Sequence, residues 1–243
     1  MKFTAKRTLL ISLMMASTAA IADTKKYGTS GSGEVGLSDS TGNTPSSSIY
    51  SSLRLKYLQK MYQLKGLVEA NNKSENGVRT KERYVGDLQG NLFFSDYQKA
   101  YGFGQTRWES DHFSDIDLNS YYIAGLGYQF LDNDTAKLSA EVGLGYQSQN
   151  YTVKSGVKDF EQAIGKFSGK FGYSFNPNVR FFQGLTEYYG EKQANFESNT
   201  GLKVKLADNL NMKVSYKYRY NSAPAAGKVK EDTESMITMI YDF

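Results

Sequence analysis

Residues 210–221 read LNMKVSYKYRYN, and residues 236–243 read MITMIYDF. In the first stretch every second side chain, from Leu210 to Tyr220, is apolar or aromatic, and those between are polar or charged. The second stretch alternates in the same way, with Asp242 on the polar side. A period of two is typical of a β-strand with one apolar face, and no helix produces it. Both stretches therefore predict strands that separate an apolar from a polar environment.

The same alternation recurs along the chain and predicts about twelve strands. Their expected ranges are 27–37, 49–57, 62–70, 83–94, 100–109, 122–130, 138–147, 166–175, 179–189, 202–206, 210–221 and 236–243. The ninth breaks phase near Gln183, which predicts a bulge there. Strands of about ten residues with alternating faces are typical of a transmembrane antiparallel up-and-down β-barrel, with the apolar side towards lipid. A soluble sandwich or a lipocalin-like barrel is the alternative fold.

The segments between the strands add to the barrel prediction. Expected connections alternate between tight turns of two or three residues and polar loops of about seven to thirteen residues, such as 71–77 and 149–159. Aromatic residues gather beside the short turns, as the interfacial girdle of a membrane barrel requires. The girdle residues are Tyr57, Tyr62, Phe94, Tyr128, Phe130, Tyr173, Phe175, Tyr241 and Phe243. No apolar run is long enough for a membrane-spanning helix.

The first 22 residues predict a cleaved signal peptide, so the barrel is expected to comprise residues 23–243. Lys2, Lys6 and Arg7 precede a short apolar run, and Ala20 and Ala22 suit a signal peptidase. Removal of these three cations lowers the formal net charge from +4 to +1, so no nucleic-acid partner is expected. The chain has no cysteine, which excludes disulfides and thiolate chemistry, and nothing predicts a cofactor or a metal ion.

Charged residues on the polar strand faces are the candidate functional residues, because they would line the lumen. The basic set is Arg54, Lys56, Lys166, Lys170, Lys203, Lys205, Lys213, Lys217 and Arg219. The acidic set in the lumen or at its mouth is Asp87, Glu109, Asp111, Asp117 and Glu141. A basic wall facing an acidic wall would set a transverse field, as solute channels do. Alternatively, these charges pair across a plugged lumen, and the sequence leaves both arrangements open.

The segment between the fifth and sixth strands holds His112, the single histidine, beside Ser110 and Asp115. A serine hydrolase would need such a triad, which keeps an outer-membrane lipid hydrolase as a remote alternative. Glu109, Asp111, Asp115 and Asp117 could instead offer oxygen ligands to calcium. We expect a salt-bridge network with Arg107 in preference to either site.

Three stretches carry a family resemblance: WESDHFSDID at 108–117, AGLGY at 124–128 and LSAEVGLGY at 138–146. They resemble the uncharacterised family known as salt-induced outer membrane proteins, which implies an outer-membrane barrel and no defined activity. The aromatic Tyr241 and Phe243 at the end resemble the signal that the barrel-assembly machinery recognises in its clients. No catalytic residue is implied by the resemblance.

The sequence thus predicts an outer-membrane β-barrel that is not an enzyme and that serves as a narrow passive channel or in envelope stress and osmoadaptation. The first alternative is a porin-like channel for anionic oligosaccharides, which the basic strands motivate. Expected partners are outer-membrane lipids, the assembly machinery and small or anionic solutes.

Overall fold

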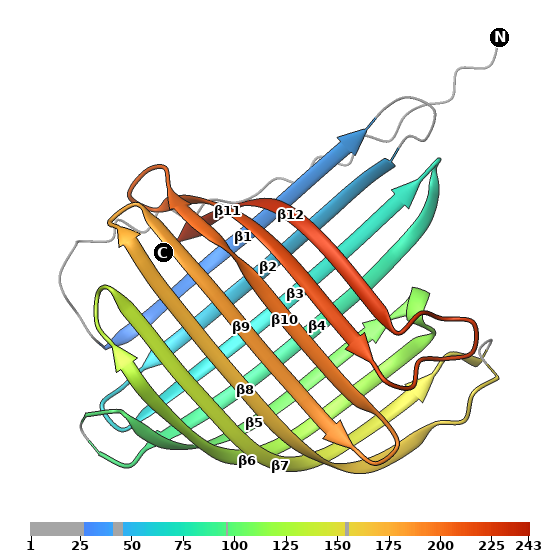
Figure 1. Cartoon of the computed structure of the whole chain (residues 1–243), viewed down its shortest axis with the longest axis horizontal. Helices are drawn as coiled ribbons and strands as arrows, with labels where there is room; N and C mark the ends of the chain where they lie inside the picture. The colour runs from blue at the N-terminus through green and yellow to red at the C-terminus, as the bar shows by residue number, and fades with distance from the viewer. Residues whose placement is uncertain (1–26, 41–45, 96, 154–155) are drawn as a thin grey trace.

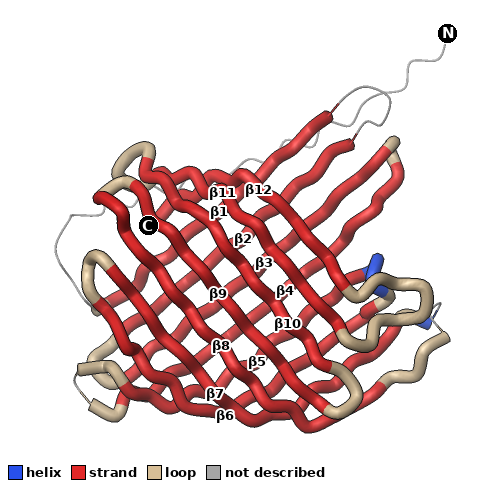
Figure 2. The backbone as a smooth tube through the Cα atoms, in the orientation of Figure 1, coloured by secondary structure: helices blue, strands red, loops and turns tan. Residues whose placement is uncertain are grey.

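The computed structural model describes residues 27–40, 46–95, 97–153 and 156–243, and these residues form a closed antiparallel barrel (Figure 1). The strands are β1 (Gly28–Ser40), β2 (Ser46–Leu58), β3 (Tyr62–Glu75), β4 (Val78–Phe93), β5 (Ala100–Asp111), β6 (Ile116–Asp132), β7 (Ala136–Tyr151), β8 (Phe160–Asn176), β9 (Val179–Gly190), β10 (Ala194–Lys205), β11 (Leu210–Asn221) and β12 (Glu231–Asp242). One short 3₁₀ helix, η1 (His112–Ser114), follows β5. The described chain is otherwise strands and connections (Figure 2). The predicted signal peptide, residues 1–22, lies outside the described residues.

Each strand pairs with its neighbours in sequence, and β12 closes the ring against β1. We call the end where β1 begins and β12 finishes the terminal end, and the other the opposite end. The seam between β1 and β12 is short, running from Ser32–Asp242 to Val35–Met239, with Gly31 and Phe243 exchanging backbone hydrogen bonds of 2.7 and 2.9 Å. By contrast, β1 and β2 pair along their whole lengths.

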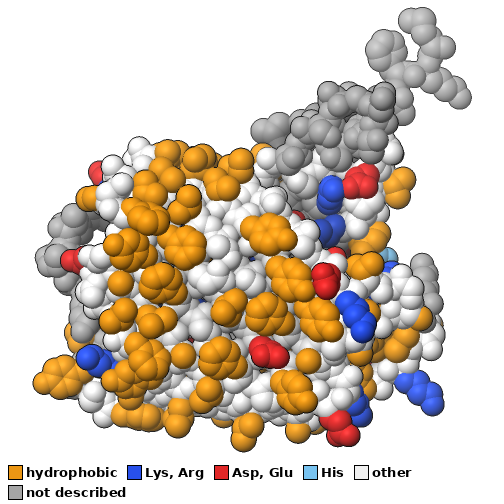
Figure 3. Space-filling view, viewed as in Figure 1, with side chains coloured by type: hydrophobic (Ala, Val, Ile, Leu, Met, Phe, Trp, Pro, Cys, Tyr) orange, Lys and Arg blue, Asp and Glu red, His pale blue; other side chains and the backbone are white. Residues whose placement is uncertain are grey.

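The outer face of the barrel is apolar, as the alternation predicted. Leu144, Ile237 and Leu88 point outward and are 77%, 65% and 54% exposed. Figure 3 shows hydrophobic side chains spread over the visible face with few charged ones among them. All nine predicted girdle aromatics are exposed, and they lie near the terminal end of their strands. This arrangement is that of a barrel surrounded by lipid. In the described part of the chain, no helix is long and apolar enough to cross a membrane.

The predicted long loops are wrong in several places, because strands extend into polar sequence. Residues 71–77 are no loop: β3 continues to Glu75, and Asn76 and Gly77 form a tight turn in which both have positive φ, 50° and 77°. Asn-Gly suits the type I′ geometry that joins hairpin strands. Likewise β10 begins at Ala194, well before the predicted start at Leu202. Connections at the opposite end therefore include short turns.

The bulge predicted at Gln183 is also wrong. Both β8 and β10 pair with β9 through Gln183 without a register shift. The shift nearest to it in β8 falls between Ser174 and Asn176, beside the turn. The break in apolar alternation has another cause: Gln183 lies on the outward phase and hydrogen-bonds with Ser198 and Thr200 of β10.

The inside of the barrel is partly filled by an apolar wall on β5, β6, β8 and β9. Tyr101, Phe103, Tyr121 and Tyr188 are buried there, and the rings of Tyr121 and Tyr188 stack with centroids 4.4 Å apart. The inward glycines of the AGLGY motif make room for this wall. A Cβ at Gly127 would overlap the ring of Tyr101, and one at Gly125 would lie 2.8 Å from the ring of Phe103.

Candidate functional site

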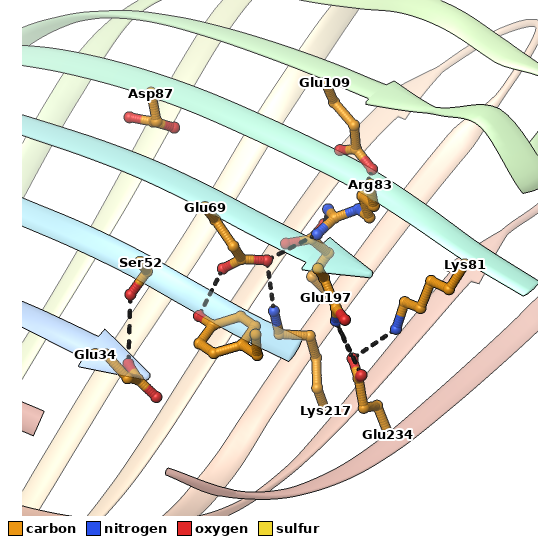
Figure 4. A network of polar contacts seen from close by, with 12 residues as sticks. Glu34, Ser52, Glu69, Lys81, Arg83, Asp87, Glu109, Glu197, Lys217 and Glu234 are labelled. Atoms are coloured by element: carbon orange, nitrogen blue, oxygen red, sulfur yellow. Dashed lines mark hydrogen bonds and ion pairs between the residues drawn. The ribbon is translucent and has the colours of Figure 1, made fainter. Parts of the chain in front are cut away.

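The lumen is crossed near its middle by a group of ion-paired side chains. Arg83 of β4 is 2% exposed and contacts three carboxylates (Figure 4). Its Nε donates to Glu109 at 2.6 Å, and its two other nitrogens contact Glu69 at 2.9 Å and Glu197 at 3.2 Å. Glu197 lies on β10, equally far from β4 in both directions around the ring. The Arg83–Glu197 contact therefore spans the full width of the lumen.

Arg107 of β5 makes a second crossing to the same carboxylate. Its guanidinium lies 3.1 Å from Glu197, 3.5 Å from Glu109 and 3.7 Å from Asp87. Lys217 of β11 completes the group through Glu69, at 3.0 Å. We call this group the crossing layer; its members are Glu69, Arg83, Arg107, Glu109, Glu197 and Lys217.

A second buried carboxylate, Glu34 of β1, is held just beside the crossing layer. It is 1% exposed, pairs with Arg54 at 3.0 Å and with Lys213, and accepts a hydrogen bond from Thr238 at 2.5 Å. Charges this deeply buried are stable only when every one has partners, because desolvation costs several kcal/mol per ion. The pairing observed satisfies that requirement.

Beyond the crossing layer, towards the opposite end, glutamines fill the lumen. Gln162 donates to Gln147 at 2.7 Å, and Gln147 donates to Gln193 at 3.2 Å. All three are buried. The pocket that remains at this end has a volume of about 70 Å³, enough for only a few water molecules. The lumen is therefore closed in this half by side chains.

On the terminal side of the crossing layer the lumen is open. A cavity of about 590 Å³ extends from Ser30, Lys56 and Asp242 at the terminal end to Arg107 and Glu197. We call it the lumen cavity. Its charged lining residues are Arg54, Lys56, Lys65, Asp87, Arg107, Glu141, Lys166, Lys170, Glu197 and Asp242. A cavity of this size is typical of ligand sites.

The predicted basic residues fall into separate groups. Lys56 and Lys170 line the lumen cavity without an ion pair to any described residue, whereas Arg54, Lys166, Lys213 and Lys217 are each paired with a carboxylate, Lys166 with Glu141 at 2.8 Å. Lys203 pairs with Asp242 and Lys205 with Asp208, near the terminal-end turn. Arg219 lines the small pocket at the opposite end. The predicted basic residues therefore do not form a single basic wall.

The predicted acidic residues are interleaved with cations. Asp87 contacts Arg107 and accepts from Gln105 at 2.7 Å, while Glu109 and Glu141 are paired as described. Asp111 caps η1 by accepting from the Ser114 amide at 3.2 Å, and Asp117 is exposed near the opposite end. Separate acidic and basic walls are therefore a wrong expectation; the alternative of charges paired across the lumen describes the crossing layer.

The residues considered for calcium or hydrolase chemistry do not converge. Asp115 pairs with Lys228 at 2.9 Å, and the His112 ring packs edge-on against Phe113. Across the described ranges, no group of three or more His, Asp or Glu side chains is arranged to hold a metal ion. Neither site is supported by this geometry.

Several residues of the site were not singled out from the sequence. Strand parity places Arg83 and Glu69 inward without giving either a role in a site, and Glu34 follows the inward phase of β1. Glu197 lies in the stretch before Leu202 that was not expected to be a strand, and nothing in its neighbourhood marks it. Lys65, directly opposite Lys56 on β3, was placed inward but given no role.

Tyr241 and Phe243, the predicted assembly signal, lie on the outward face at the terminal end and are 52% and 50% exposed. Their position leaves the aromatic rings accessible from outside the barrel. Recognition by the assembly machinery stays a prediction.

Comparison with known proteins agrees with the barrel. Residues 33–243 match the family described as "Protein of unknown function, DUF481". The uncharacterized protein YdiY of Escherichia coli (strain K12) is 27% identical over 184 residues, which cover 76% of this chain and 71% of that protein.

Among solved structures, the COG4313 outer membrane channel from Pseudomonas putida F1 has a TM-score of 0.54 at 10% identity, over 92% of this chain and 100% of that one. The NanC porin has a TM-score of 0.49 at 11% identity, over 88% and 97%. The likeness to the COG4313 channel is one of fold. With the match spanning nearly all of the described barrel, this chain belongs to the DUF481 family of outer-membrane β-barrel proteins.

Proposed function

We propose that this protein is a narrow channel whose constriction is the crossing layer. The observation that supports it is Glu197, which joins Arg83 and Arg107 across the lumen between an open cavity and a filled half. The barrier is built from side chains rather than from a backbone plug, so rotation of a few side chains would open a path. Barrels of eight strands are filled and those of sixteen are open, and twelve strands leave room for such an arrangement.

The channel is proposed to lie in the outer membrane with its terminal end in the periplasm. Short connections at the terminal end and exposed aromatics beside them support this orientation. The lumen cavity would then open towards the periplasm, and the glutamine-filled half would face the cell exterior.

The test is single-channel conductance of the refolded protein in a planar bilayer. A Glu197→Ala variant removes the carboxylate that joins Arg83 and Arg107 to β10, while Glu109 still bridges the two cations, so the contact across the lumen is lost and the constriction widens. We expect the conductance to rise several-fold over the wild type. Glu191→Ala, which removes the same charge from an exposed connection outside the lumen, is the matched control and should conduct as the wild type does.

Equal conductance in wild type, Glu197→Ala and the control would remove the crossing layer as the constriction. A folded barrel that stays silent in every variant would remove the channel altogether.

A second candidate is a channel for anionic oligosaccharides. The surplus of cations among the charged lining residues of the lumen cavity favours it. Passage of a sugar would require the crossing layer to part completely. Swelling of proteoliposomes in an acidic disaccharide, compared with a neutral one of equal size, tests this candidate; equal rates would contradict it.

A further inference from the structure

Two lysines face each other directly on the wall of the lumen cavity. Lys56 of β2 and Lys65 of β3 are register partners in the antiparallel ladder, and both line the cavity. Residues directly opposite in such a ladder have Cβ atoms about 4.5–5.5 Å apart, and like charges there are destabilising. The sheet keeps this like-charged pair on the inner wall of the barrel.

A third lysine reaches the same cavity from a distant strand. Lys170 of β8 lines it together with Lys56 and Lys65. In the described part of the chain, none of these three lysines forms an ion pair. The Lys65 ammonium lies 5.9 Å from the centroid of the Tyr101 ring.

The four acids that line the cavity cannot neutralise these lysines, because each already has a cation. Asp87 contacts Arg107, Glu141 contacts Lys166, Glu197 contacts Arg83 and Arg107, and Asp242 contacts Lys203. Arg54, the remaining cation of the lining, is paired with Glu34. Lys56, Lys65 and Lys170 are therefore the cations of the lining that no described carboxylate contacts as an ion pair.

A neutral donor stands beside this charge. Gln105 lines the cavity and donates one hydrogen bond from its Nε2 to Asp87 at 2.7 Å, so the second N–H of that amide can donate to an oxyanion. The cavity ends at Arg107, so a ligand entering from the terminal end would stop at the crossing layer with its charge among the lysines. The cavity thus combines unpaired cations, a hydrogen-bond donor and a closed end at the crossing layer, which together can hold a ligand.

We propose that Lys56, Lys65 and Lys170 form a binding site for a small anion that carries two or more negative charges on carboxylate or phosphate groups. The site rests on the proposed function, because its ligand enters the lumen of the same channel. One multivalent anion relieves the repulsion of the opposed lysines and compensates Lys170 at once, which a monovalent anion cannot do.

Isothermal titration of the refolded full-length barrel in detergent micelles tests the site, with citrate as the carboxylate probe and pyrophosphate as the phosphate probe. We expect one binding site for at least one probe and much weaker binding of acetate. Substitution of all three lysines, K56Q/K65Q/K170Q, should weaken binding at least about tenfold, which corresponds to about 1.4 kcal/mol. The charge-preserving variant K56R/K65R/K170R should retain it.

The matched control is K99Q/K137Q/K158Q, which removes the same number of charges from exposed connections and strand ends. It should bind as the wild type does. The site would be overturned if neither citrate nor pyrophosphate bound. It would also be overturned if K99Q/K137Q/K158Q lost as much affinity as K56Q/K65Q/K170Q. Folding of each variant is checked by heat-modifiable migration on gels.

Equilibrium binding requires no ion flow, so the site and the channel can fail separately. Binding in a barrel that never conducts would retain the site and remove the proposed channel. Conduction without binding would retain the proposed channel and remove the site.

Discussion

The crossing layer and the lumen cavity differ in how their lysine residues are paired. In the crossing layer Lys217 contacts Glu69 at 3.0 Å, and every buried cation has a carboxylate partner. In the lumen cavity Lys56 and Lys65 face each other without one. Charge in the crossing layer holds strands together across the barrel; the opposed Lys56–Lys65 pair in the lumen cavity opposes folding and is retained for another reason. Neutralising Lys217 should therefore have an effect of opposite sign to neutralising Lys56 or Lys65.

The largest expected effect is that of Arg83→Met in the crossing layer. The substitution removes the guanidinium that joins Glu69, Glu109 and Glu197, and it leaves their buried charges short of a partner. Breaking a buried ion pair from one side costs about 3–5 kcal/mol. We expect the free energy of unfolding, measured by urea titration in lipid vesicles, to fall by that amount.

Arg79→Met is the control for Arg83, because Arg79 lies on the same strand and also contacts a carboxylate, Glu82 at 2.7 Å. That pair is solvent-exposed, and exposed pairs contribute about 0–1 kcal/mol. An equal loss of stability in Arg83→Met and Arg79→Met would mean that the crossing layer stabilises the fold no more than an exposed ion pair does.

A smaller loss is expected from Glu34→Gln. Glutamine keeps the shape of the side chain and can still accept the Thr238 hydrogen bond, but it removes the charge that faces Arg54 and Lys213. Hydrogen bonds to charged groups contribute about 1.5–3 kcal/mol, so the free energy of unfolding should fall within that range. Glu75→Gln at the exposed end of β3, where Glu75 pairs with Lys73, should change it by less than about 1 kcal/mol. An unchanged unfolding curve for Glu34→Gln would contradict the assignment of Glu34 to a charge-dependent contact.

The smallest effect has the opposite sign. Lys56→Gln or Lys65→Gln should each stabilise the ligand-free barrel by about 0.2–1 kcal/mol, because either one removes the opposed positive pair. The double variant should gain little beyond one single variant, and this non-additivity measures the repulsion. Lys217→Gln should destabilise the barrel in the same assay. If Lys56→Gln and Lys65→Gln both destabilised the barrel, the proposed difference between the crossing layer and the lumen cavity would be wrong.

Strand parity accounts for most of what the sequence could predict. Alternation placed Leu144, Ile237 and their equivalents outside and Arg83, Arg107 and Glu141 inside, because a strand separates its two faces automatically. It failed where polar residues occupy both faces, as at Asn195–Thr200, where Ser198 and Thr200 face outward and conceal β10. The Asn76–Gly77 turn carried a recognisable signal that the surrounding polar residues obscured.

Pairing across the lumen could not be predicted in the same way. Parity states that Glu197 and Arg83 point inward, but their contact depends on strand tilt and stagger, which set the level of each residue along the barrel axis. Local sequence carries no information about which residues on opposite walls share a level. For this reason parity could place single residues inside the barrel, while their division into a paired layer and an unpaired cavity required the structure.

The short seam between β1 and β12 has a consequence for how the barrel forms. Its contacts join residues such as Glu34 and Thr238, which are 204 positions apart in the chain. Closing so long a loop costs much chain entropy, and few ladder hydrogen bonds compensate for it at this joint. The seam is therefore expected to form last in folding and to exchange its amide hydrogens first, because it is the weakest strand pairing of the barrel.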